Sequence, residues 1–167
     1  MDGNVFATWQ PHPAMKTLAI PSTRSVSDKV LRAIATAFPM LDHLEVRAEA
    51  GSVTAAGLAH LQKLRKLDHL TLTGDAVDSA GLAHIVTLDQ IIHLGIGSAR
   101  LAEEDARLFA KLGSLRELEL NNPPVSDAAL KGYAKLRGLM QFKIGSKTKP
   151  EVMDKLVIAL PTVKVIP

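Results

Sequence analysis

The stretch Leu41-Asp42-His43-Leu44-Glu45-Val46 recurs along the chain as Leu67-Asp68-His69-Leu70-Thr71-Leu72 and as Ile91-Ile92-His93-Leu94-Gly95-Ile96. Further copies begin at Leu115 and Leu139, a weaker one begins at Met15, and a partial one begins at Val163. The starting positions are 26, 26, 24, 24, 24 and 24 residues apart. Self-similarity at a nearly constant period indicates a repeat architecture, in which each unit is one small supersecondary structure.

A second pattern follows each copy of this stretch. Apolar residues recur there at spacings of three, which places them on one face of a helix. These trios are Leu58, Leu61 and Leu64; Leu82, Ile85 and Leu88; Ala106, Phe109 and Leu112; and Leu130, Tyr133 and Leu136. Thr54, Asp78 and Ser126 precede three of the trios, where their side-chain oxygens could cap a helix. The change of period from 2 to about 3.6 within each unit predicts a strand followed by a helix.

This organisation resembles the leucine-rich-repeat family over residues 15–166. The segments at residues 53–61 and 77–85 are similar to bacterial units of the form V-T-D-A-G-L-A-H-L. The resemblance implies an α/β fold, a right-handed leucine-rich-repeat solenoid shaped as a horseshoe segment. Its parallel β-sheet would lie on the concave side and its helices on the convex side.

The expected domain covers residues 15–167, with six strand–helix units and a terminal strand. Residues 1–14, which contain Phe6 and Trp9, are expected to form an N-terminal cap, an expression leftover being the alternative. The asparagine that is common in the family after the strand is replaced here, so no ladder of asparagine side chains is expected. Glu49, Asp75, Ala99 and Pro123 occupy that place.

The outward positions of the predicted strands form the candidate binding surface. In a stacked sheet the first, fourth and sixth positions point into the core, while the third, fifth and seventh point outward. The candidate partner-binding residues are His43, Glu45, Arg47, His69, Thr71, Thr73, His93, Gly95, Glu117, Glu119, Asn121, Gln141 and Lys143. Because the fold does not require these residue types, we expect this face to be the main contact site, ahead of the helical side and the loop rims.

Composition excludes several kinds of chemistry. The chain has no cysteine, which rules out disulfides and thiolate metal sites. No apolar run approaches the ~18 residues of a membrane span, and the N-terminus lacks the features of a secretory signal. We therefore expect no membrane partner and, by default, a cytoplasmic location, although a removed leader or secretion as an effector remains open.

Nucleic acid is not the expected partner. The net charge is only +3, and Lys63, Lys111 and Lys135, which share one repeat position, are explained by the dipoles of the helices that they end. No aromatic residues interleave with them for base stacking. An anionic partner stays open as a minor alternative.

The histidine column His43, His69 and His93 could bring two imidazoles close enough to share a metal ion. Repeat duplication is the favoured explanation, because His60 and His84 recur in the same way on the helical side. A milder hypothesis is that crowded histidines make binding sensitive to pH. We expect no metal and no cofactor.

Two further patterns suggest catalysis only weakly. Glu117 and Glu119 would lie ~7 Å apart on one strand face, a spacing that suits an inverting glycosidase, but an open sheet does not enclose them. Gly95-Ile96-Gly97-Ser98 lacks the third glycine of a dinucleotide-binding turn. The acidic run Glu103-Glu104-Asp105 is expected to be solvated at a helix start.

We therefore predict a non-catalytic protein–protein interaction module that binds its partner on the concave sheet. The alternative is an adaptor or effector module that recognises substrates for a separate catalytic partner, such as a ubiquitin ligase. Val163, Val165 and Ile166 would form an exposed edge strand. That edge could be blunted by Pro167, continued in a longer protein, or paired with a second copy, and a monomer is favoured over a dimer.

Overall fold

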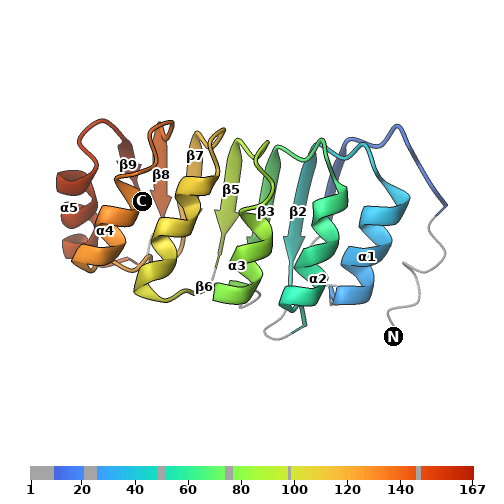
Figure 1. Ribbon diagram of the computed structural model, residues 1–167, viewed down its shortest axis with the longest axis horizontal. Coiled ribbons are helices and arrows are strands. Elements are labelled where there is room, and N and C mark those ends of the chain that lie inside the picture. Colours follow the sequence, from blue (N-terminus) through green and yellow to red (C-terminus); the bar gives the residue numbers. More distant parts are fainter. Residues whose placement is uncertain (1–9, 21–25, 49–51, 74–76, 98, 146–147) are drawn as a thin grey trace.

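The computed structural model describes residues 10–20, 26–48, 52–73, 77–97, 99–145 and 148–167, with strands and helices alternating along the chain (Figure 1). The strands of the main sheet are β1 (Thr17–Ile20), β2 (His43–Arg47), β3 (His69–Thr73), β5 (His93–Ile96), β7 (Glu117–Leu120), β8 (Gln141–Ile144) and β9 (Lys164–Ile166). The helices are α1 (Asp28–Ala37), α2 (Ala55–Ala59), α3 (Ser79–Ile85), α4 (Asp127–Tyr133), α5 (Pro150–Ala159) and two 3₁₀ helices, η2 (His60–Lys63) and η3 (Glu103–Lys111).

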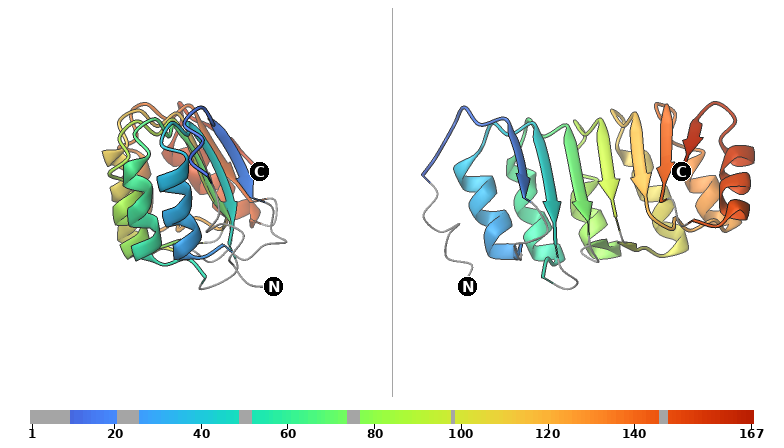
Figure 2. Two further views of the ribbon diagram at one scale, coloured as in Figure 1. Left: turned by 90° about the vertical axis from the view of Figure 1, so that its right-hand side faces the viewer. Right: turned by 180° about the vertical axis from the view of Figure 1, so that it is seen from behind.

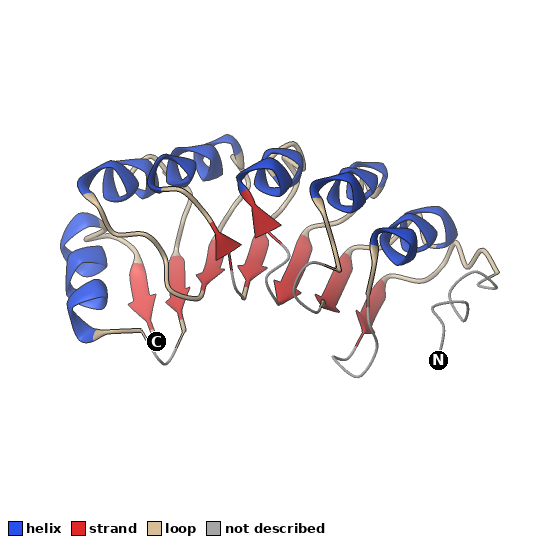
Figure 3. Cartoon of the chain, turned by 90° about the horizontal axis from the view of Figure 1, so that it is seen from below, coloured by secondary structure: helices blue, strands red, loops and turns tan. Residues whose placement is uncertain are grey.

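The main sheet is open, and all of its described pairs are parallel. Its strand order is β1-β2-β3-β5-β7-β8-β9. The helices lie along one side of this sheet and leave its other side uncovered, as the side view of Figure 2 and the view from below in Figure 3 show. The prediction of an α/β fold with an open parallel sheet is confirmed. A second parallel pair, β4 (Val77–Asp78) with β6 (Ala99–Arg100), was not predicted and joins two loops.

The strand register follows the predicted spacing except at the C-terminal end. His43 pairs with His69 and His69 with His93, at separations of 26 and 24 residues. In the last pair Gln141 lies beside Lys164, a separation of 23, so the predicted start of the last unit at Val163 is wrong by one residue. The apolar pattern was misread here, because Val165 and Ile166 are adjacent and either could take the inward fourth position, which the structure gives to Val165 beside Phe142.

The core is one layer of apolar side chains between the sheet and the helices. Most leucines of the strands and most members of the helical trios are buried, while Leu18 and Leu130 are only half-buried. Two of the helical segments are 3₁₀ helices and not the α-helices that a period of 3.6 implies. The spacing of three residues within each trio fits 3.0 residues per turn, but the trios of α3 and α4 have the same spacing, so spacing alone does not explain this difference.

The helix N-termini are capped as predicted. The side chains of Thr54, Asp78 and Ser126 each accept a hydrogen bond from a backbone N–H in the first turn of the following helix. Neighbouring units are also joined at this edge, because the Asp28 carboxylate accepts hydrogen bonds from the backbone N–H and the hydroxyl of Thr54, at 2.8 and 2.7 Å. Polar side chains therefore hold successive helix starts together.

Asp105 departs from the expectation of a solvated acidic run. Its side chain is only 6% exposed, and it accepts hydrogen bonds from the backbone N–H of Ala102 at 2.7 Å and from the hydroxyl of Ser79. Glu103 accepts a bond from the Ser126 N–H at 3.3 Å. The acidic run thus links three units, and the solvated interpretation is wrong for Asp105.

Several expectations fall on residues that the structure leaves out. Phe6 and Trp9 of the predicted cap, and Glu49 and Asp75 at the turn position, lie outside the described residues. Across neighbouring turns, backbone hydrogen bonds run from Ala48 N to the Thr73 carbonyl and from Gly97 N to the Leu72 carbonyl. Among the described residues no helix is both long and apolar enough to cross a membrane.

Candidate partner-binding surface

The uncovered sheet face carries nearly all of the predicted binding residues at or near the surface. All of the predicted residues except Gly95 are at least partly exposed. A Cβ atom at Gly95 would lie 3.1 Å from the Thr71 hydroxyl oxygen, and one at Gly97 would lie 3.0 Å from the Thr73 Cβ. The threonines of β3 therefore cover Gly95 of β5 and Gly97 just beyond it. The prediction that Gly95 is available to a partner is wrong.

The three histidines of the column form a continuous stack. The ring centroids of His43 and His69 are 5.2 Å apart with planes inclined by 18°, and those of His69 and His93 are 5.7 Å apart with planes inclined by 12°. This arrangement follows from the parallel register, which repeats the same position once per strand. The rings lie face to face instead of converging on a shared point, so the stack presents ring edges to a partner.

Carboxylates orient two of these rings. The Nδ1 atom of His69 lies 2.7 Å from an oxygen of Asp68, and the Nδ1 atom of His93 lies 3.1 Å from an oxygen of Glu117. Among the described residues no group of three or more histidine and acidic side chains is placed to hold a metal ion. The stack and its two carboxylates therefore form a fixed polar ridge along the start of strands β2, β3 and β5.

Two further pairs of opposite charges lie on this face. Lys143 Nζ lies 3.1 Å from Glu119, and Arg47 Nε lies 3.8 Å from Glu45. Exposed pairs of this kind contribute at most about 1 kcal/mol each. A partner that brings its own charges can therefore replace them at small cost, and the face can exchange internal ion pairs for intermolecular ones.

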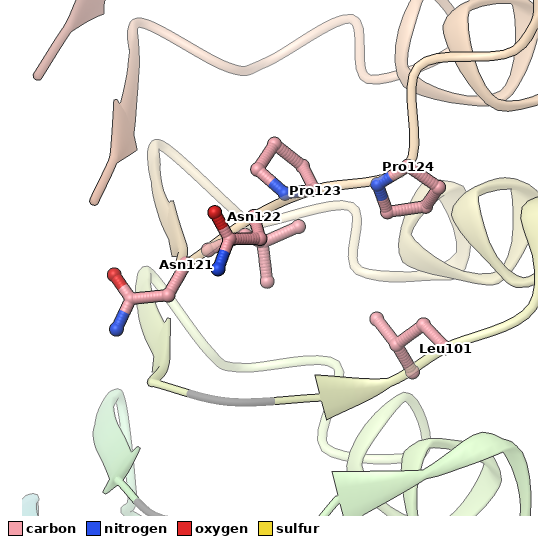
Figure 4. Close-up of a pocket in the computed structure, with 6 residues that line it drawn as sticks. Leu101, Asn121, Asn122, Pro123 and Pro124 are labelled. Atoms are coloured by element: carbon pink, nitrogen blue, oxygen red, sulfur yellow. The ribbon is translucent and has the colours of Figure 1, made fainter. Parts of the chain in front are cut away.

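A small pocket adjoins this face where strand β7 ends. It has a volume of about 100 Å³ and is lined by Leu101, Leu120, Asn121, Asn122, Pro123 and Pro124. Figure 4 shows Leu101 on one side of it and the loop of two asparagines and two prolines on the other. Drug-sized ligands need about 300 Å³ or more, so the pocket suits a single amino-acid side chain.

The pocket was not predicted, and of its lining residues only Asn121 was among the expected binding residues. Asn122 has a φ of 51°, a left-handed conformation that asparagine tolerates better than most residues. It turns the chain out of β7 into the two prolines. The Asn-Asn-Pro-Pro run is a turn signal, and it could have indicated an irregular loop beside the sheet.

Comparisons with known proteins do not assign this surface. No protein-family model matches the chain, and no curated protein matches it.

Proposed function

We propose that this chain is a leucine-rich-repeat solenoid that binds a protein partner on the concave, uncovered face of its parallel sheet and has no catalytic centre of its own. One observation carries the proposal. A seven-stranded sheet is packed against helices on one side only, and its free side displays an ordered array of histidine, charged and threonine side chains. The fold needs none of these residue types at those places.

The dimensions of the face favour a macromolecule over a small ligand. Seven strands at ~4.8 Å, each about four residues long, give a surface of roughly 29 by 13 Å. A standard protein interface covers about 800 Å² on each partner, so a protein that fills this face would also reach the loop rims. The pocket beside Asn121 lies on such a rim and could receive one side chain of the partner.

The same geometry disfavours catalysis. Glu117 and Glu119 belong to separate pairs, with His93 and with Lys143, and both lie on an open sheet. Raised carboxyl pKa values in glycosidases depend on an enclosed apolar site, which this face does not supply. The adaptor hypothesis would need a separate catalytic partner and stays a prediction.

A pull-down with matched charge variants tests the proposal. The sheet variant combines Glu45→Lys, Glu119→Lys and Lys143→Glu. The control combines Glu104→Lys, Asp127→Lys and Lys131→Glu, which are exposed residues of helices η3 and α4, and has the same net charge. The expected result is that wild type and control recover the same partner and that the sheet variant loses it. Recovery of that partner by all three proteins would reject the sheet as the binding site.

A further inference from the structure

One long edge of the molecule combines exposed apolar side chains with exposed cations. At this edge the helices end and the strands begin, which is the upper edge in Figure 1. The large hydrophobic side chains that are well exposed among the described residues are Met40 (46%), Ile92 (39%), Met140 (66%), Val157 (48%) and Ile158 (80%). All of them lie in the last turn of a helix or in a connection from a helix to the next strand.

Six cations of this edge are free to face a partner. They are Lys63, Arg65, Lys66, Lys111, Lys135 and Arg137, all exposed, and none forms an ion pair with the described residues. Two acidic side chains at the same edge are paired, Asp42 with Lys16 and Asp68 with His69. Asp89 also lies at this edge and forms no ion pair with the described residues. We call these six cations and five apolar residues the basic edge.

The opposite edge has the reverse character, because most of its charged side chains are acidic. Examples at the helix starts are Asp78, Glu103, Glu104, Asp127 and Glu151. Helix dipoles favour this division, with anions at helix starts and cations at helix ends. They do not explain why the exposed apolar side chains gather with the cations, so the basic edge needs a second explanation.

Apolar and cationic side chains alternate along the basic edge. Met40 lies between the first two strands, Arg65 and Lys66 between the next two, Ile92 follows, and then Lys111. The last connections carry Met140 with Lys135 and Arg137, and then Ile158. A stable protein interface has a contiguous apolar core, which this alternation prevents. Single-stranded nucleic acid requires stacking aromatics. Among the described residues this edge exposes no phenylalanine, tyrosine or tryptophan, and the histidine rings at the strand starts are already stacked on one another.

We propose that the basic edge docks on the surface of an anionic lipid bilayer. There, separate apolar side chains can enter the interfacial layer while the cations between them contact anionic headgroups. A row of connections along one side of a seven-stranded sheet suits a planar surface, and the sheet face stays open beside it. The sequence led us to expect no membrane partner because no segment spans a bilayer. Docking of this kind does not need such a segment.

Binding to vesicles tests this proposal with the full chain. Sedimentation with vesicles of phosphatidylserine and phosphatidylcholine should bring the protein down, and vesicles of phosphatidylcholine alone should not. Each cation near an anionic leaflet strengthens binding about fivefold, so Arg65→Gln, Lys66→Gln and Lys111→Gln together should weaken it about a hundredfold. The control variant Lys29→Gln, Lys131→Gln and Lys149→Gln has the same net charge and should bind within about twofold of wild type.

The apolar residues separate this proposal from general attraction to anions. Met140→Ser with Ile158→Ser should weaken vesicle binding about tenfold or more, because burial of each side chain is lost. If that variant binds vesicles like wild type, or if duplex DNA or an acidic polypeptide binds the protein more tightly than the vesicles do, the proposal is wrong. The sheet variant with Glu45, Glu119 and Lys143 reversed should keep vesicle binding, so this test and the pull-down fail independently.

Discussion

Replacing Gly132 by alanine tests how closely neighbouring units pack. Gly132 lies on α4 against the middle of η3. A Cβ atom there would lie 2.7 Å from the backbone N of Arg107 and 2.8 Å from the carbonyl carbon of Ala106. Ordinary contacts begin near ~3.5 Å. The two helices would therefore have to separate by about 0.8 Å, and backbone atoms cannot rotate away as a flexible side chain can.

The expected cost combines two opposing effects. Overpacking of this kind destabilises by about 1–3 kcal/mol, while alanine in a helix gains about 0.5–1 kcal/mol over glycine. A net loss of about 1–2 kcal/mol should lower the melting temperature of a chain of this size by about 2–8 °C.

Gly113→Ala is the matched control, because a Cβ atom at Gly113 would have nothing within 4 Å. Its effect should stay within about 0.5 kcal/mol. Thermal unfolding followed by circular dichroism measures both variants. Equal melting temperatures for the two variants, or a stabilised Gly132→Ala protein, would refute the close contact between these units.

Two further substitutions concern buried polar groups. Tyr133→Phe should leave stability unchanged or raise it by up to about 1 kcal/mol near neutral pH, because the Tyr133 hydroxyl is buried without a hydrogen-bond partner. Burial, with a smaller contribution from Glu103, raises the pKa of Tyr133, so the folded chain keeps a proton that the unfolded chain loses above about pH 10. Urea unfolding at about pH 8 and about pH 11 measures this difference. The free energy of unfolding of wild type should fall by up to ~1.4 kcal/mol more than that of Tyr133→Phe for each pH unit above 10. Equal falls for the two proteins would contradict the prediction. Asp105→Ala should destabilise the fold by about 2–4 kcal/mol, because it leaves the Ala102 N–H and the Ser79 hydroxyl without their acceptor. A double-mutant cycle with Ser79→Ala should show a coupling energy above about 0.5 kcal/mol. Additive effects would show that the Ser79 contact contributes nothing.

Much of the fold followed from the repeat spacing, because parallel pairing brings equivalent positions together. The separations of 26 and 24 residues correctly placed His43 beside His69 and His69 beside His93. The same reasoning failed at the last strand, where Val163, Val165 and Ile166 are all apolar. Alternation between apolar and polar residues carries the information about register, and it is lost between the adjacent Val165 and Ile166, either of which could point inward.

Side chains that act between units were harder to predict. Glu103, Glu104 and Asp105 look alike at a helix start, and Asp105 is the buried one because Ser79, 26 residues earlier, lies beside it. Gly95 illustrates the same limit on the candidate site. Its position on the outward face was correct, but the Thr71 side chain on the neighbouring strand covers it. Such outcomes depend on neighbours that only the stacked units bring together.

The histidines provide the most direct test of binding on the sheet. His43, His69 and His93 lie on the uncovered face, whereas His60 and His84 lie on the helical side. The partner recovered by pull-down is added stepwise while the imidazole NMR signals are recorded. These signals report on the sheet face and on the helical side in the same experiment. The account predicts that the signals of His43, His69 and His93 shift or broaden and that those of His60 and His84 stay in place. Shifts confined to His60 and His84 would contradict it and place the partner on the helices.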